Sequence, residues 1–203
     1  ARQVGIAVPK QPYGSLLTTT FSVVIVGEYN VGKSTLINAL LGRRLLPTGS
    51  LPTTTAAAMV SHERTDDSEQ LLATGLVSHT VDLPLLKDLT IFDTPGTNAI
   101  RDHTALTLEL LPSADLIVFC TSADRPFSQS ERNLLSDIAT FRKSLLVVVT
   151  KMDILETAGG DHGRTEKQKV VDFVTQQAMD ILNDSTVPVM ALSARDALAA
   201  KLT

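Results

Sequence analysis

The sequence is poor in the side chains that bind single-stranded nucleic acid. It contains no tryptophan, and aromatic residues make up 4% of its 203 residues. Platforms that stack unpaired bases are built from such rings, so their scarcity argues against this kind of binding. The formal net charge of −4 supplies no overall basic surface for a phosphate backbone. We therefore expect no nucleic acid among the partners.

Cysteine and long apolar runs are scarce as well. Cys120 is the single cysteine of the sequence, which excludes an intrachain disulfide, and its place in the apolar run ADLIVFC predicts a buried thiol. No apolar run approaches the ~20 residues that a membrane-spanning helix needs. The chain starts without methionine and without a signal-peptide pattern. We expect an excised domain, with any segment that addresses the full protein to a compartment or a membrane outside it.

What the sequence does contain is an alternation of short β-branched runs and helical patterns. Residues 1–20 are expected to form a lead-in segment, and residues 21–203 a single domain. Residues 46–58 predict a loop that leads into a strand, and the polar residues 61–75 predict a hairpin connection. The predicted strands are Phe21–Gly27, Leu89–Asp93, 114–122, Ser144–Thr150 and 187–193. The predicted helices are Lys33–Leu41, 106–111, 128–141, 165–182 and Ala194–Leu202, with Ser128 or Ser130 capping the third.

This alternation predicts a doubly wound α/β fold, with a mostly parallel sheet and helices on both faces. Ligands of such sheets bind at the carboxyl ends of the strands. Four short motifs stand at those ends.

The first motif, GEYNVGKS, follows the first predicted strand and opens the first predicted helix. It fits G-x-x-x-x-G-K-[ST], whose backbone N–H groups and helix N-terminus surround phosphate oxygens. Lys33 is expected to reach the β- and γ-phosphates as a catalytic residue, and the Ser34 hydroxyl to coordinate Mg²⁺. The nucleotide-binding residues predicted here are Glu28, Tyr29, Asn30, Val31, Gly32, Lys33, Ser34 and Thr35.

The second motif, DTPG, follows the strand LTIFD. A carboxylate in this position holds Mg²⁺ through water, and a glycine N–H meets the γ-phosphate. We therefore assign Asp93 to the metal site and Gly96 to catalysis.

The third and fourth motifs, TKMD and SAR, indicate which base is bound. The Asp153 carboxylate can accept two hydrogen bonds, from N1–H and the 2-amino group of guanine, and adenine offers no such pair. Lys151 would cover the base, and the Ala194 N–H would meet the guanine 6-oxo group. The base-side residues are Thr150, Lys151, Asp153, Ser193, Ala194 and Arg195. The predicted ligands are thus GTP or GDP with Mg²⁺.

In these motifs and their order, the chain resembles the GTPase domain of dynamin-like proteins from about Phe21 onward. The segments that carry the resemblance are GEYNVGKSTLINALLGRRLLPTGSLPTTTAAA, LLKDLTIFDTPGTNAI, LIVFCTSADRPFSQSE, VTKMDIL and ALSARDALAAKL. Fuzzy-onion-like plastid proteins and their bacterial relatives are the most similar members. The resemblance implies a membrane-remodelling GTPase that forms homodimers through its nucleotide face. It also implies a chloroplast membrane (thylakoid or envelope), or else a bacterial inner membrane, reached through segments outside this chain.

The resemblance further implies a switch threonine that ligates Mg²⁺ and positions the attacking water. Counting from Pro47 gives Thr54, with Thr53 and Thr55 as neighbouring alternatives. Thr97 stands where many small GTPases carry a water-orienting glutamine. Asn30 matches an asparagine of potassium-activated GTPases. Its oxygen would either hold K⁺ (or Na⁺) against the phosphates during catalysis or make a purely structural hydrogen bond.

The sequence is also compatible with two other functions, and it does not decide the role of Arg125. The chain could be a ribosome- or RNA-associated GTPase stimulated by K⁺, or a GTP-gated tether that scarcely hydrolyses its ligand. Arg125 would be either a solvated charge or a contact to a partner across the nucleotide face. Arg43 and Arg44 are interpreted as a solvated helix end.

Overall fold

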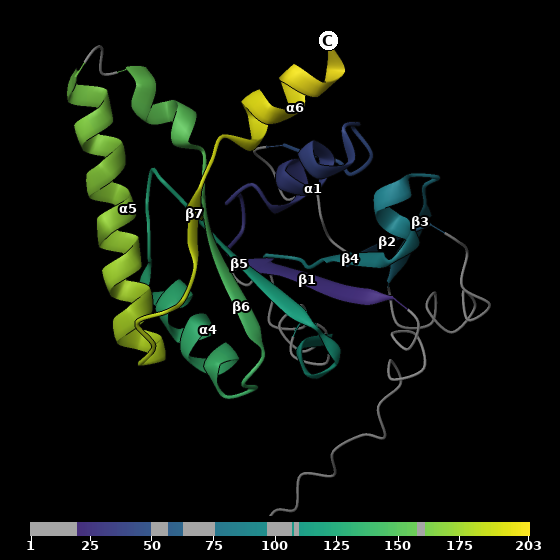
Figure 1. Ribbon diagram of the computed structural model, residues 1–203, viewed down its shortest axis with the longest axis horizontal. Coiled ribbons are helices and arrows are strands. Elements are labelled where there is room, and N and C mark those ends of the chain that lie inside the picture. Colours follow the sequence, from purple (N-terminus) through teal and green to yellow (C-terminus); the bar gives the residue numbers. More distant parts are fainter. Residues whose placement is uncertain (1–19, 50–56, 63–75, 97–106, 108–109, 158–160) are drawn as a thin grey trace, which may run out of the picture.

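The computed structural model describes residues 20–49, 57–62, 76–96, 107, 110–157 and 161–203. Its centre is a seven-stranded sheet of order β3-β2-β4-β1-β5-β6-β7 (Figure 1). The strands are β1 (Phe21–Gly27), β2 (Ala58–Ser61), β3 (Val77–Thr80), β4 (Leu89–Asp93), β5 (Leu116–Ser122), β6 (Ser144–Thr150) and β7 (Val189–Ala191). The order reverses around β1, so the carboxyl ends of β1, β4, β5 and β6 gather at one edge.

Strand β1 lies at the centre of the sheet, so every one of its residues except Phe21 is buried. It pairs in parallel with β4, where Ile25 stands beside Asp93, and in parallel with β5, where Gly27 stands beside Cys120. Continuous apolar runs suit such strands because helices cover both faces of the sheet. The Cys120 thiol is fully buried, as its apolar run predicts.

Alternate side chains of β1 enter two separate cores. Val24 and Val26 pack on one face with α4 (Gln129–Ala139) and α5 (Asp161–Leu182). Val23 and Ile25 pack on the other face with α1 (Lys33–Leu41) and α6 (Ala194–Leu202). Figure 1 shows these two helix pairs on opposite sides of the sheet. The predicted doubly wound α/β fold is therefore confirmed.

One prediction about connectivity is wrong. Strands β2 and β3 run parallel, with Ala58 beside Val77, so the residues between them do not form a hairpin connection. The antiparallel partner of β2 is β4. The polar composition of residues 61–75 indicates exposure and carries no information about strand direction. Residues 63–75 lie outside the described residues.

Several element bounds differ from the predicted ones. The last strand is confined to Val189–Ala191, and α5 begins at Asp161 rather than at residue 165. In the stretch 106–111, Thr107 and Leu110 are helical. Residues 1–19 of the predicted lead-in segment lie outside the described residues. In the described part of the chain, no helix is both long enough and apolar enough to span a membrane.

Candidate nucleotide-binding site

The P-loop, residues 27–34, connects β1 to α1 and has the backbone that its glycines predict. Gly27 has φ 150°, and a Cβ there would lie 2.3 Å from the Cys120 carbonyl oxygen. Gly32 adopts a left-handed conformation at the N-cap of α1, where no side chain caps the helix. The loop thus ends at a helix N-terminus, the kind of site that binds anions.

Lys33 lies inside this loop rather than in solvent. Its side chain is buried, and Nζ donates hydrogen bonds to the carbonyl oxygens of Gly27 at 3.2 Å and Glu28 at 2.9 Å. Burial lowers the pKa of Lys33, and the negative charge of Asp93 opposes that shift. A phosphate group brings the anion that a buried ammonium group favours.

Ser34 and Asp93 form the metal side of the site. The Ser34 hydroxyl donates a hydrogen bond of 2.6 Å to Oδ2 of Asp93. Oδ1 of Asp93 is buried and has no hydrogen-bond partner among the described residues. Burial raises the pKa of Asp93, which Lys33 and Ser34 oppose. A hydroxyl and an unsatisfied carboxylate oxygen suit Mg²⁺, which takes oxygen ligands.

Gly96, at the end of the DTPG motif, packs closely against the P-loop backbone. A Cβ on Gly96 would lie 2.4 Å from both N and Cα of Tyr29. This contact accounts for glycine at the end of DTPG. Gly96 also lines the cavity that Lys33 and Ser34 line.

The base-side motifs meet in a second pocket of about 480 Å³, which begins at Asn30 and Gly32 and continues to α6. Asp153 is buried, and Nη2 of Arg195 lies 3.0 Å from its Oδ2. The Thr150 hydroxyl is bonded to the Val31 carbonyl oxygen of the P-loop and, at 3.1 Å, to that of Thr121. The residues of TKMD and SAR that line this pocket are Thr150, Lys151, Asp153, Ala194 and Arg195.

Asn30 lies between the two pockets and lines both. Its side chain is exposed, and its φ of 60° lies in the left-handed region. Asparagine tolerates that region better than most residues do. The backbone alone therefore favours asparagine here, independently of any cation.

Some residues were missed by sequence reasoning or lie outside the described part. Arg44 and Thr48 line the base pocket and are both exposed. Nothing in the pair of arginines distinguished Arg44 from Arg43. The switch candidates Thr53, Thr54 and Thr55 lie outside the described residues, as does Thr97. Cofactor-binding and catalytic roles thus remain predictions, although the described motif residues converge on one edge of the sheet.

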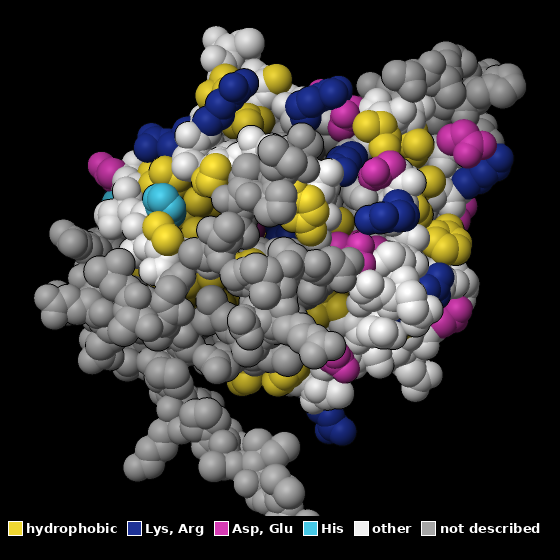
Figure 2. Space-filling model, turned by 180° about the vertical axis from the view of Figure 1, so that it is seen from behind, with side chains coloured by type: hydrophobic (Ala, Val, Ile, Leu, Met, Phe, Trp, Pro, Cys, Tyr) yellow, Lys and Arg dark blue, Asp and Glu magenta, His cyan; other side chains and the backbone are white. Residues whose placement is uncertain are grey.

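Charged side chains of both signs share the rear face of the molecule. Figure 2 shows basic and acidic side chains interspersed over the described part of the rear face, without a continuous patch of one sign.

Comparisons with known proteins connect this geometry to a family. The family model described as 50S ribosome-binding GTPase matches residues 22–151. A probable transmembrane GTPase of Arabidopsis thaliana, FZO-like and chloroplastic, is 39% identical over 194 residues, which cover 93% of this chain and 21% of that protein. The chain thus spans about a fifth of the length of this relative.

Solved structures share the fold at lower sequence identity. A bacterial dynamin from an oligomerised pair, described as sensing and tethering membranes, superposes with a TM-score of 0.70 at 19% identity; the match covers 89% of this chain and 34% of that one. Toc33 from Arabidopsis thaliana, in complex with Mg²⁺ and GMPPNP, gives a TM-score of 0.62 at 16% identity, covering 90% and 75%. The family implies guanine nucleotide and Mg²⁺ as ligands. The chain belongs to this GTPase family and is a G domain of the dynamin-like kind.

Proposed function

We propose that this domain hydrolyses GTP at a rate that rises when two copies meet through their nucleotide faces, and that a longer protein uses this cycle to fuse, divide or reshape a membrane. The observation that carries the proposal is the convergence of the P-loop, DTPG, TKMD and SAR residues in two adjoining pockets. The 39% identity to a transmembrane FZO-like GTPase supports the membrane role.

Each side chain has a proposed task in hydrolysis. Lys33 would exchange its two backbone carbonyl partners for β- and γ-phosphate oxygens. Ser34 and Asp93 would hold Mg²⁺, which when bound neutralises developing phosphate charge. The Gly96 N–H would bind the γ-phosphate, and Thr54 would position the attacking water. Asp153 would accept the guanine N1–H and 2-amino hydrogens.

The membrane is proposed to be that of a chloroplast, with a bacterial inner membrane as the alternative. The chloroplastic relative supports the first assignment.

The dimer part of the proposal is tested by turnover per molecule against protein concentration. We expect the rate per molecule to rise with concentration, because the partner completes the site. A substantial rate that is independent of concentration would contradict stimulation by dimerisation. A flat and negligible rate would instead support a GTP-gated tether, which the absence of a glutamine at Thr97 also favours.

A ribosome- or RNA-associated GTPase is the second candidate. The description of the matching family model favours it, and so does the asparagine at position 30. Adding RNA or ribosomal particles to the turnover assay distinguishes the two. Stimulation by RNA with no effect of protein concentration would favour this second candidate.

Asn30 is proposed to hold a monovalent cation against the phosphates. Its position between the two pockets supports this. The test compares turnover in K⁺ and in choline for the wild type and for Asn30→Gly, because glycine keeps the left-handed backbone and removes the amide oxygen. We expect K⁺ stimulation in the wild type and its loss in the variant. Equal rates in K⁺ and choline for the wild type would refute the cation site.

A further inference from the structure

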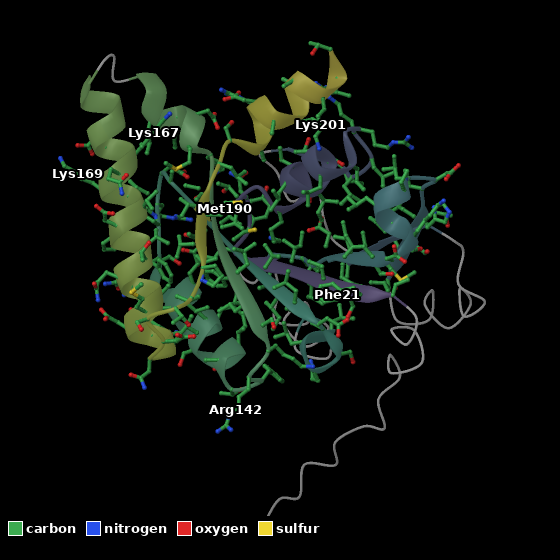
Figure 3. All side chains as sticks on the ribbon, viewed as in Figure 1. Phe21, Arg142, Lys167, Lys169, Met190 and Lys201 are labelled. Atoms are coloured by element: carbon green, nitrogen blue, oxygen red, sulfur yellow. The ribbon has the colours of Figure 1, made fainter. Side chains whose placement is uncertain are left out.

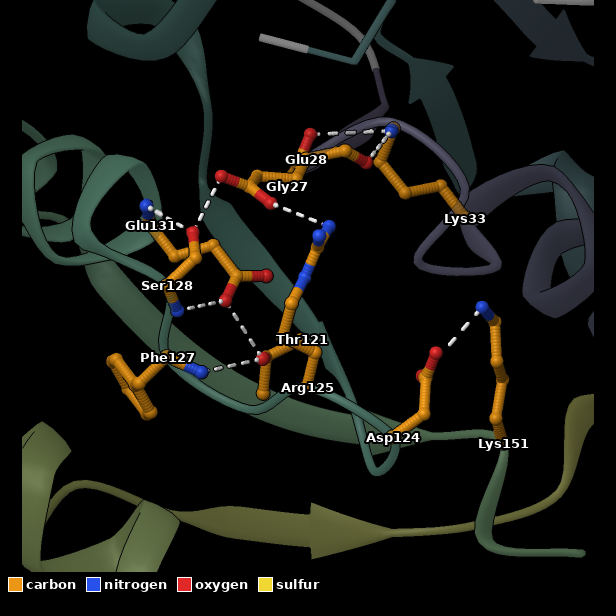
Figure 4. A network of polar contacts seen from close by, with 10 residues as sticks. All are labelled: Gly27, Glu28, Lys33, Thr121, Asp124, Arg125, Phe127, Ser128, Glu131 and Lys151. Atoms are coloured by element: carbon orange, nitrogen blue, oxygen red, sulfur yellow. Dashed lines mark hydrogen bonds and ion pairs between the residues drawn. The ribbon is translucent and has the colours of Figure 1, made fainter. Parts of the chain in front are cut away.

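The P-loop carries a buried carboxylate that the phosphate-binding pattern does not require. Glu28 occupies a variable position of the motif and is 2% exposed. The Ser128 hydroxyl is bonded to its Oε1, and Nη2 of Arg125 lies 3.6 Å from its Oε2 (Figure 4). At the other end of the residue, the Glu28 carbonyl oxygen accepts a hydrogen bond from Lys33. Glu28 therefore connects the phosphate-binding lysine to the segment between β5 and α4.

That segment is held in a fixed shape. Ser128 and Glu131 form a capping box, in which Ser128 N donates to Glu131 Oε2 at 2.9 Å and Glu131 N donates to Ser128 Oγ at 3.2 Å. Phe127 is buried with a left-handed φ of 55°, and its N–H donates to Thr121 Oγ1 at 3.2 Å. Such a backbone persists only where its surroundings over-determine it. Arg125 and Ser128 are thus presented to Glu28 by a built turn.

Two acidic groups lie behind the P-loop. Burial and the charge of Glu28 raise the pKa of Glu131 to about 7. Both carboxyl groups also act on Lys33, whose ammonium group they stabilise. A nucleotide adds further negative charge on the other side of Lys33. An uncompensated Glu28 would oppose that addition through a largely buried, weakly screened interaction.

The same turn reaches the base-side loop. Asp124 Oδ1 lies 3.7 Å from Nζ of Lys151, and the adjacent Arg125 reaches Glu28 (Figure 4). Two consecutive residues of opposite charge therefore contact the two nucleotide-binding loops. The turn at Asp124 and Arg125 thus links the P-loop to the base-side loop through two ion pairs.

We propose that Arg125 is a positioning residue of the nucleotide site, which offsets the Glu28 carboxylate within the same chain and so allows phosphate to bind at Lys33. The inference rests on the nucleotide site described above and assigns Arg125 a partner in cis. An arginine committed to a partner copy would act on the nucleotide of that copy instead. The Arg125 side chain is 74% exposed, so its removal leaves the core intact.

A double-mutant cycle tests this pairing. The variants are Arg125→Ala, Glu28→Gln and their combination, with binding measured as the Kd for a fluorescent non-hydrolysable GTP analogue at low protein concentration. We expect Arg125→Ala to weaken binding about fivefold in the wild type, a factor typical of an ion pair with one exposed partner. In the Glu28→Gln background the same change should alter Kd less than about twofold, because the carboxylate charge is gone.

Two further variants separate this role from general effects. Arg142 projects into solvent beyond the opposite end of α4 (Figure 3), and Arg142→Ala removes the same charge without changing Kd. Arg125→Lys keeps a cation beside Glu28 and should recover most of the affinity. Thermal unfolding of each variant verifies that the compared proteins are folded.

The measured affinities test the Arg125–Glu28 pair separately from the nucleotide site. An equal loss of affinity in both Glu28 backgrounds would show that Arg125 acts outside this pair, for instance on the nucleotide of a second copy. An unchanged Kd for Arg125→Ala would equally overturn the proposal. A wild-type chain that failed to bind the analogue would refute the nucleotide site, which is a different result.

Discussion

The Ser34 hydroxyl lies 2.6 Å from Oδ2 of Asp93, although 59 positions separate the two residues in the chain. They meet because β1 and β4 are parallel neighbours and end at the same edge, with Ile25 beside Asp93. The hydroxyl and the carboxylate are the donor pair that the P-loop and DTPG motifs predict for Mg²⁺.

Ser34→Ala should abolish most of the Mg²⁺-dependent gain in GTP affinity. The alanine removes one metal ligand and one hydrogen bond, so we expect the free energy of unfolding to fall by only about 1 kcal/mol. The measurement is GTP affinity with excess Mg²⁺ and with EDTA. Ser136→Ala, at an exposed position of α4, is the matched control. If the variant kept the wild-type Mg²⁺ dependence, Ser34 would not be a ligand.

Gly96→Ala should separate the DTPG loop from the P-loop. The new Cβ would meet the Tyr29 backbone at 2.4 Å, and neither partner is a flexible side-chain end. We expect a loss of stability of about 1–3 kcal/mol and a larger loss of affinity for GTP than for GDP, since the Gly96 N–H is proposed to meet the γ-phosphate. Calorimetric binding of both nucleotides and thermal unfolding test this.

Gly42→Ala provides the contrast for Gly96. Gly42 has φ 66°, and a Cβ there meets only Lys201 side-chain atoms, at 3.6 Å or more. Its replacement should cost roughly 1 kcal/mol through the left-handed backbone and leave both affinities unchanged. An equal fold-loss of affinity for GTP and for GDP in Gly96→Ala would contradict the assignment of Gly96 to the γ-phosphate.

Thr150→Val should weaken nucleotide binding through the P-loop backbone. The Thr150 hydroxyl joins the Val31 and Thr121 carbonyl oxygens, and valine has the same shape but cannot donate. Leaving these buried carbonyl groups without that donor costs about 1–3 kcal/mol of stability. GTP affinity should fall together with the midpoint of thermal unfolding. Thr140→Val removes an exposed hydroxyl bond to Asp137 and should change neither quantity. Unchanged GTP affinity in Thr150→Val would contradict this role.

The sequence predicted the fold because buried parallel strands produce continuous apolar runs, and because each motif follows one of them. Once the strands are parallel neighbours, GEYNVGKS, DTPG and TKMD must meet at one edge. The direction of β3 was not predictable, since its short partly exposed stretch carries no pattern that distinguishes parallel from antiparallel pairing.

The contacts of Glu28 could not be predicted from the sequence either. Glu28 and Ser128 are 100 positions apart, and the variable positions of a P-loop impose no residue type. The left-handed backbone of Asn30 likewise appears only in the folded loop. Asparagine at that position is therefore compatible with a backbone role and with the cation role together.

Glu131→Gln should change how stability depends on pH. The pKa of Glu131 is raised from 4.5 to about 7, chiefly by burial, with the Glu28 charge adding to the shift and Arg125 opposing it. Between these two values the folded protein holds a proton that the unfolded chain has lost. The stabilisation linked to this proton is complete below the unfolded value and is lost as pH rises towards 7. Glutamine is neutral throughout and avoids this loss.

The free energy of unfolding of the wild type, minus that of Glu131→Gln, should therefore decrease from pH 5 to pH 8 and level off above about pH 7. Urea unfolding at intervals of pH measures both proteins, and taking the difference cancels the titration of groups that the two share. Glu166→Gln, which removes a carboxyl group from an exposed position of α5, is the matched control. A constant difference for Glu131→Gln would mean that Glu131 is already ionised at pH 5. Glu131 would then add a second negative charge beside Glu28, and Arg125 would have to offset both charges.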